Sequence, residues 1–202
     1  MTIRTIAAGL SLALLTASAC SQTAEPQAEA TDEVQAPEFI PATFEAPTLV
    51  ETADFKVVPL CPDLVDVDYE AYMSSIEHLQ ETFTRSTNWP REDLTAEDAM
   101  KDMETEQARF EKRESFAYAV LTPDGSRERG CVYVYLSTVE GYDAVIRVWV
   151  TKAELDAGFD EELYAWAQEW IANDWPFEKA AYPGRAIAWE EWDALTKTAE
   201  AS

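Results

Sequence analysis

Basic residues are scarce in this chain of 202 residues: lysine and arginine number 15, against 39 aspartates and glutamates, for a formal net charge of -24. Affinity for nucleic acid depends on Lys and Arg side chains that neutralise phosphates, so this balance excludes a nucleic-acid-binding protein. The acidity keeps a protein in solution, and it also suits a small amine or another cationic partner.

Histidine, cysteine and glycine are also rare. One histidine, His78, and three widely spaced cysteines make none of the recognisable zinc or transition-metal motifs. Asp63, Asp66 and Asp68 are clustered, but the sequence around them lacks the glycine and the terminal glutamate of an EF-hand loop. The six glycines form neither a GxSxG motif nor a Walker loop, which excludes the commonest hydrolases and NTPases. We therefore expect no metal site.

No apolar run is long enough to span a bilayer, because residues 6–15 fall short of the roughly 20 residues required. Arg4 precedes this run and the small residues 17–19 follow it, which is the pattern of a cleaved secretory signal. Cys20 comes next, and this order resembles a bacterial lipoprotein signal, although residues 17–19 also suit ordinary secretion. We expect a signal peptide over 1–19 and a lipid anchor on Cys20 that holds the protein to a membrane on the periplasmic side of the bacterial cell envelope.

Residues 20–54 are rich in Pro, Ala and acids and contain no basic residue, which predicts a disordered tether. The alternative is that Phe39, Ile40 and Phe44 dock on the domain. A single domain is expected over residues 55–197, followed by a tail over 198–202.

Strands are predicted where apolar residues alternate, and Pro123-Asp124-Gly125 predicts the turn of a hairpin between the second and third of them. The expected strands are residues 55–60, 116–120, 131–136, 143–150 and, more weakly, 177–182.

Helices are predicted where apolar residues recur every three or four positions. In the first predicted helix, which starts at Asp68, His78 lies opposite the apolar stripe and is expected to face solvent. Thr95 to Asp98 resembles a capping box that opens the second. The expected helices run from Asp68 to about residue 83, from Thr95 to about 110, over 159–170, and over a short stretch at 189–195. This order predicts an α+β or mixed α/β layer fold.

Three strings resemble the GNAT superfamily of acyl-CoA N-acyltransferases: residues 116–120, 130–135 and 144–150. The resemblance covers residues 55–182 and implies a central, mostly antiparallel sheet with helices on both faces and a shortened C-terminal part. It also implies that the fourth and fifth strands diverge, so that acetyl-CoA or another acyl-CoA lies between them. Anions bind well at a helix N-terminus, where the pyrophosphate sits in this family. The matching cofactor-binding positions are Trp149, Val150, Thr151, Lys152 and Gly158.

The sequence also departs from the family. Gly158 is the only glycine in the turn where the family has several, and the acids Glu154, Asp156, Asp160 and Glu161 crowd that turn. Val145 stands where the related branch has a glutamate base. Asp143 could replace this base, and Tyr182 could protonate the leaving thiolate. Two hypotheses follow: an exported N-acyltransferase that moves an acyl group to an amine, or a non-catalytic envelope module that binds a ligand on the same fold.

The strand order also predicts the state of two cysteines. Cys61 ends the first strand and Cys131 begins the third, so one strand separates them. Two inter-strand steps of about 4.8 Å exceed the reach of a disulfide. We therefore expect two free, largely buried thiols.

Overall fold

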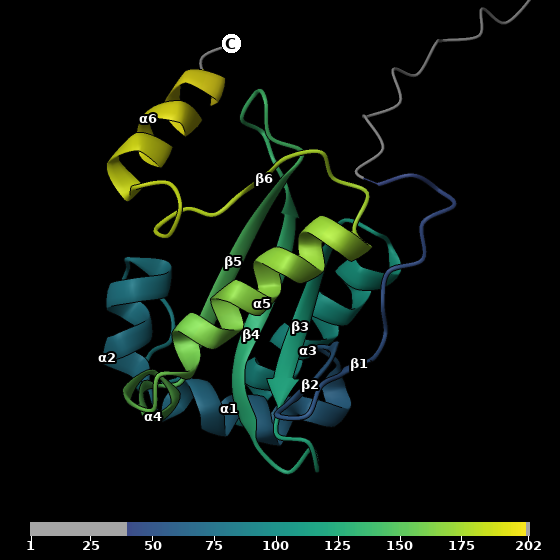
Figure 1. Ribbon diagram of the computed structural model, residues 1–202. Coiled ribbons are helices and arrows are strands. Elements are labelled where there is room, and N and C mark those ends of the chain that lie inside the picture. The colour runs from purple at the N-terminus through teal and green to yellow at the C-terminus, as the bar shows by residue number, and fades with distance from the viewer. Residues whose placement is uncertain (1–39, 201–202) are drawn as a thin grey trace, which may run out of the picture. The chain divides into compact units, whose positions relative to one another are not determined.

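A six-stranded sheet forms the centre of the computed structural model, which describes residues 40–200 (Figure 1). The strands lie in the sheet in chain order, and all neighbours are antiparallel except β5 and β6, which are parallel. The predicted hairpin and fourth strand are confirmed, whereas the fifth strand is reduced to two residues. The strands are β1 Val50–Glu51, β2 Lys56–Pro59, β3 Ser115–Leu121, β4 Glu128–Leu136, β5 Ala144–Val150 and β6 Ala180–Ala181.

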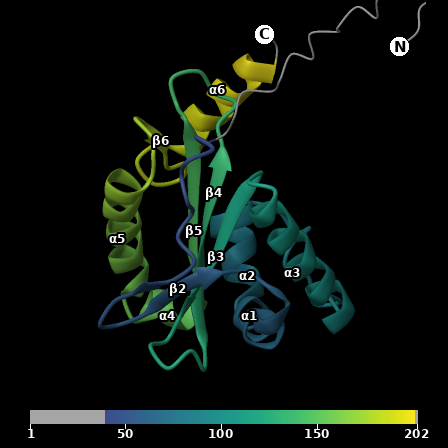
Figure 2. The same cartoon turned by 90° about the vertical axis from the view of Figure 1, so that its right-hand side faces the viewer.

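Helices cover both faces of the sheet, as expected: α5 lies on one face, and α1, α2 and α3 lie on the other (Figure 2). A third, smaller cluster packs α6 beside β6. None of these helices within residues 40–200 is long and apolar enough to cross a bilayer. The helices are α1 Val65–Met73, α2 Ile76–Leu79, α3 Ala96–Glu111, α4 Lys152–Asp156, α5 Phe159–Asp174 and α6 Trp189–Glu200, with single turns η1 Pro62–Leu64 and η2 Gln80–Thr84.

The capping box predicted for α3 is confirmed. The Thr95 hydroxyl accepts a hydrogen bond from the backbone N–H of Asp98 at 3.2 Å, and the Asp98 carboxylate accepts one from the backbone N–H of Thr95 at 2.9 Å. The box satisfies two backbone donors that the first helical turn leaves without a partner.

The first predicted helix is broken, and this changes the side on which His78 lies. The helix α1 ends at Met73, α2 starts at Ile76, and η2 is a π-helical turn. Each interruption rotates the following residues relative to an unbroken helix with 3.6 residues per turn. The expectation that His78 faces solvent is therefore wrong: it is half-buried and faces the edge of the sheet.

The domain starts earlier than residue 55. Ile40 is buried in the α5-side core, Phe44 packs against the same core, and β1 pairs with β2. Arg113 fixes this segment by donating hydrogen bonds to the carbonyls of Pro41 and Phe44, at 2.7 and 2.9 Å. For residues 40–54 the docked alternative therefore replaces the disordered tether. Phe39, Cys20, residues 1–19 and the end of the tail lie outside the described residues.

Cys61 and Cys131 are both free in the structure. Cys61 follows β2 and Cys131 lies in β4, with β3 between them. Cys131 is buried, and its thiol donates a hydrogen bond to a carboxylate oxygen of Glu128 at 3.0 Å.

Candidate functional site: a groove along the edge of β5

The strands β5 and β6 pair only at Ala144 with Ala180 and at Val145 with Ala181. Beyond these pairs they separate, and a cavity of about 340 Å³, which we call the β5 groove, runs along the remainder of β5. Its walls come from α2, η2, α4, α5, β5 and the segment between β6 and α6. The lining residues are His78, Glu81, Thr82, Phe83, Ile146, Arg147, Val148, Trp149, Leu155, Tyr164, Tyr182, Pro183, Gly184, Arg185 and Trp189.

The groove exposes backbone as well as side chains. The backbone N–H of Thr151 bonds toward β4, and the carbonyl of Val150 faces away from it. Successive residues of a strand direct their backbone polar groups to opposite edges, so Ile146 and Val148 face the same way as Val150. A strand edge of this kind is a template for an extended chain of amides.

His78 lies at the α4 end of the groove. Its Nε2–H donates a hydrogen bond to the carbonyl of Val150 at 3.2 Å. Burial lowers the pKa of His78, although the bond to Val150 and nearby acids oppose this effect. The imidazole is therefore neutral at pH 7, and it covers one acceptor of the free strand edge.

Arg147 closes the middle of the groove on the η2 side. Its guanidinium donates to the carbonyl of Phe83 and lies over the Phe83 ring, with its carbon 4.3 Å from the ring centroid. The same guanidinium carbon is 5.0 Å from the centroid of the Trp189 ring. Glu81 provides a carboxylate, and among the lining residues no other acid is present.

Tyr182 lies at the other end of the groove, next to the paired part of β5 and β6. Burial, and to a smaller extent Tyr164, raises its pKa to about 12, so the phenol is protonated at neutral pH. Arg185 follows it and forms a double hydrogen bond with Asp160, with both N to O distances at 2.5 Å.

The turn that follows β5 differs from the one that the sequence resemblance implies, because the short helix α4 is inserted before α5. The Thr151 hydroxyl caps α4, and Lys152 pairs with Asp156. Gly158 has a φ of +85° and precedes α5, which has no side-chain cap. A φ in this range favours glycine, which explains why this glycine is present. Of the five predicted cofactor-binding residues, Trp149 alone lines the groove.

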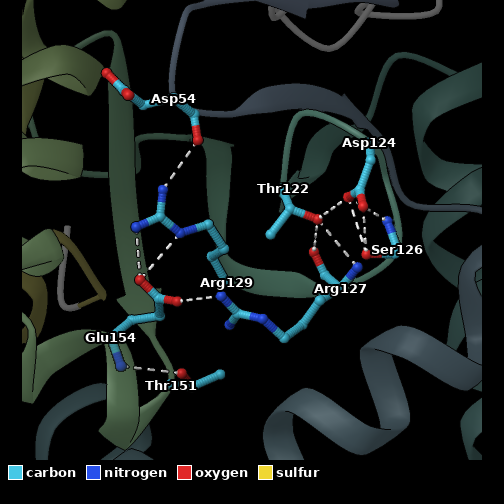
Figure 3. Close-up of polar contacts among 8 residues, drawn as sticks. All are labelled: Asp54, Thr122, Asp124, Ser126, Arg127, Arg129, Thr151 and Glu154. Carbon is cyan, nitrogen blue, oxygen red and sulfur yellow. Dashed lines mark hydrogen bonds and ion pairs between the residues drawn. The ribbon is translucent and has the colours of Figure 1, made fainter.

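Glu154 is held by two arginines rather than facing the groove (Figure 3). Arg129 contacts one carboxylate oxygen at 2.6 and 3.0 Å, and Arg127 contacts the other at 2.7 Å. Burial disfavours the ionised form of Glu154, but the arginines outweigh it and lower its pKa. With Asp156 paired to Lys152 and Asp160 paired to Arg185, three of the acids that crowd this turn have basic partners.

Asp143 has a structural role that differs from the proposed catalytic one. Its carboxylate accepts hydrogen bonds from the backbone N–H groups of Glu178 and Lys179, both at 2.8 Å. It holds the segment before β6 beside β5 and is not among the groove residues. Val145, at the position of the missing glutamate, packs in the cluster around α6.

The residues present fit the amide-containing arm of an acyl-CoA better than its diphosphate. The strand edge and the cavity suit an extended amide chain, and Tyr182 can donate a hydrogen bond at one end. An acyl-CoA would supply a thioester whose acyl group an amine can attack. The N-terminus of α5 has no side-chain cap, so its backbone N–H groups are available as donors. The residues beside it are acids that are paired with basic side chains, whereas a diphosphate would favour basic residues at these positions.

Sequence reasoning missed several groove residues, among them His78, Glu81, Arg147 and Arg185. The positions of His78 and Glu81 could not be predicted because the first helix is interrupted twice. A pair of consecutive serines, Ser74 and Ser75, was the available signal for the first interruption, since serine favours helix ends. Arg185 follows Pro183 and Gly184, a dipeptide that is typical of a turn.

Comparison with known proteins finds solved structures with a similar fold but no match to the sequence. No protein-family model and no curated protein matches the sequence. Among solved structures, a ribosomal-protein-S5-alanine acetyltransferase from Vibrio fischeri matches with a TM-score of 0.50 and 12% identity over 62% of this chain and 67% of that chain. An acetyltransferase from Salmonella typhimurium that modifies the N-terminal serine of a 50S ribosomal subunit protein has a TM-score of 0.46 and 11% identity, over 61% and 67% of the two chains.

The microcin C7 self-immunity acetyltransferase, solved with acetyl-CoA and AMP, has a TM-score of 0.46 and 12% identity over 64% of this chain and 70% of that chain. At these identities the similarity concerns the fold alone. The chain is a mixed α/β protein whose six-stranded, mostly antiparallel sheet and flanking helices match the fold of the GNAT-type acetyltransferases.

Proposed function

We propose that this protein is an N-acyltransferase that binds an acyl-CoA in the β5 groove and transfers the acyl group to an amine. The observation that carries the proposal is the separation of β5 from β6 after two residue pairs, which leaves a cavity of about 340 Å³ along a free strand edge. The GNAT-type fold of the chain supports the same reaction class.

Two groove residues have chemical roles in this proposal. Glu81 is the carboxylate on the groove wall and accepts a proton from the attacking amine. Tyr182 keeps its proton, because its pKa of about 12 lies above the value of about 8.5 that is usual for a thiol. It therefore acts as a hydrogen-bond donor to the leaving sulfur, not as a proton donor.

The test measures release of free thiol from acetyl-CoA with a panel of amines. We expect Glu81→Gln to lower kcat about 100-fold and to remove the acidic limb of the pH profile, since general-base catalysis contributes about 10²–10⁴-fold. Glu77→Gln, on exposed α2 surface outside the groove, is the matched control and should leave kcat unchanged. Thiol release that is absent with every amine, or equal in Glu81→Gln and wild type, contradicts the proposal.

A non-catalytic binding module is the second candidate, and the hydrogen bond from His78 to Val150 favours it. This bond occupies a backbone acceptor that an amide arm would use. In addition, the turn beside α5 contains acids that are already paired with Lys152 and Arg185. Saturable acetyl-CoA binding without thiol release would support this candidate, whereas turnover would exclude it.

We also propose that the protein works on the periplasmic side of the cell envelope, held to a membrane by a lipid on Cys20. The order of charge, apolar run, small residues and cysteine in residues 1–20 supports this location. Cells fed a radiolabelled fatty acid should label the wild-type protein and not the Cys20→Ser variant. Unlabelled wild-type protein that is cleaved and released into the periplasm would favour ordinary secretion instead.

A further inference from the structure

A second cavity lies among α1, η2, α3 and the face of β4. Its volume is about 260 Å³, and we call it the acidic aromatic pocket. Phe83 lines both cavities and Arg147 lines only the groove. The lining residues of the acidic aromatic pocket are Leu60, Asp68, Tyr72, Phe83, Thr84, Trp89, Asp102, Met103, Glu106, Tyr133 and Tyr135.

Three acids line this pocket, and burial raises the pKa of one of them, Asp68, to about 7. Asp68 is only 3% exposed, Glu106 is half-buried and Asp102 lies at the surface. No lysine or arginine is among the lining residues. Two bases lie outside the lining: Arg109 contacts one oxygen of Glu106 at 2.8 Å, and the guanidinium carbon of Arg147 is 4.3 Å from the centroid of the Phe83 ring. Burial raises the pKa of all three acids, and the charge of Asp102 contributes to the increase for Asp68 and Glu106. Such a site favours binding of a cation.

Two buried polar atoms of the pocket residues have no hydrogen-bond partner within residues 40–200. The second carboxylate oxygen of Glu106 and the hydroxyl of Tyr72 are buried without a hydrogen bond to any group of residues 40–200. Tyr72 as a whole is 2% exposed. A buried polar group without a partner costs about 1–3 kcal/mol, and a bound donor would remove that cost for Glu106.

Aromatic rings form the remaining walls. Tyr72 and Trp89 have ring centroids 5.1 Å apart, Phe83 and Tyr133 are 5.5 Å apart, and Tyr133 stacks on Tyr135 at 5.7 Å. Ring faces attract cations and also bury alkyl carbon, which is why aromatic cages recognise alkylated ammonium groups.

We propose that the acidic aromatic pocket binds a primary alkylammonium ion, with its N–H groups on Glu106 and Asp68 and its alkyl chain against Trp89 and Tyr72. A quaternary ammonium ion has no N–H group for the unpartnered oxygen of Glu106. A calcium ion requires six to eight oxygens around it, and the ring faces provide none. The inference does not depend on what the β5 groove binds, and a protein that fails to bind acetyl-CoA would leave it intact.

The experiment is a calorimetric titration of the full chain at constant ionic strength with propylammonium, tetramethylammonium and calcium chlorides. We expect saturable propylammonium binding that is at least fivefold weaker in Glu106→Gln and unchanged in Tyr72→Phe, which keeps the ring against the alkyl chain. Glu104→Gln removes the same charge from an exposed position of α3 outside the pocket and should bind as wild type does. Because Tyr72→Phe deletes a hydroxyl without a partner among residues 40–200, its melting temperature should not fall.

Three outcomes would overturn the proposal. Equal weakening in Glu104→Gln and Glu106→Gln would mean general attraction to an acidic protein. Tetramethylammonium binding as tight as that of propylammonium would remove the role of the N–H groups. Calcium that binds more tightly and displaces propylammonium would make the pocket a metal site.

Discussion

His78 and Val150 are 72 residues apart in the sequence, yet the imidazole Nε2–H donates to the Val150 carbonyl at 3.2 Å. The contact joins α2 to the end of β5 and covers part of the strand edge that the β5 groove exposes. It is therefore a direct competitor for any ligand that pairs with this edge.

Removing this competitor should strengthen ligand binding. For His78→Ala we expect at least a threefold lower Kd for acetyl-CoA by calorimetry, because the Val150 carbonyl becomes free and no imidazole must move. Glu77→Ala, at the neighbouring exposed position of α2, is the control. An unchanged or higher Kd in His78→Ala would mean that the ligand does not reach Val150.

The Arg129 and Glu154 pair should contribute to folding. Glu154 is 6% exposed, and Arg129→Met would leave it with Arg127 alone. Breaking a buried ion pair is strongly destabilising because one charge stays buried. We expect a loss of about 2 kcal/mol in the free energy of unfolding, measured with urea. Lys152→Met breaks an exposed pair with Asp156 and should change stability by less than about 0.5 kcal/mol. Equal effects would show that burial is unimportant here.

Stability should fall as pH rises through neutrality. Burial raises the pKa of Asp68 to about 7 and that of Glu128 well above its usual value. Between pH 4 and 7 the folded chain therefore holds protons that the unfolded chain has released, so the free energy of unfolding decreases with pH. One pKa unit corresponds to about 1.36 kcal/mol, so we expect Asp68 alone to lower the free energy of unfolding by roughly 2–3 kcal/mol between pH 5 and 8.

Asp68→Asn should flatten this pH dependence, and Asp66→Asn, exposed on the same helix, should preserve it. Urea unfolding at a series of pH values is the measurement. A free energy of unfolding that rises over this range in the wild-type protein would show that Asp68 is ionised in the folded state.

Asp143 should act through hydrogen bonds to the backbone. Asp143→Ala loses two acceptor contacts to the segment before β6, and we expect a lower free energy of unfolding by about 1–2 kcal/mol. Asp143→Asn keeps one acceptor oxygen and should retain most of the stability and all of any turnover. Turnover abolished in Asp143→Asn, with stability preserved, would restore Asp143 as the base.

Local patterns predicted the elements of this fold well. The turn chemistry at residues 123–125, the alternation in β5 and the spacing of Leu163 and Trp170 each depend on neighbours along the chain. The Thr95 capping box also lies within four residues. Such signals can be read directly from a sequence.

The arrangement of the site depends on contacts between residues that are far apart in the sequence. No local pattern shows that Arg127 and Arg129 neutralise Glu154, although the sequence does show that acids crowd that turn. His78 was misplaced because a two-residue break rotates a helix. Ile40 was assigned to a tether by composition, although Arg113 fixes the segment that follows it.

The central claim is that the free edge of β5 receives an extended ligand. Hydrogen–deuterium exchange of the backbone amide of Val148, with and without saturating acetyl-CoA, tests it most directly. The account predicts slower exchange at this amide when acetyl-CoA is present. Unchanged exchange there, with acetyl-CoA shown to bind, would contradict it.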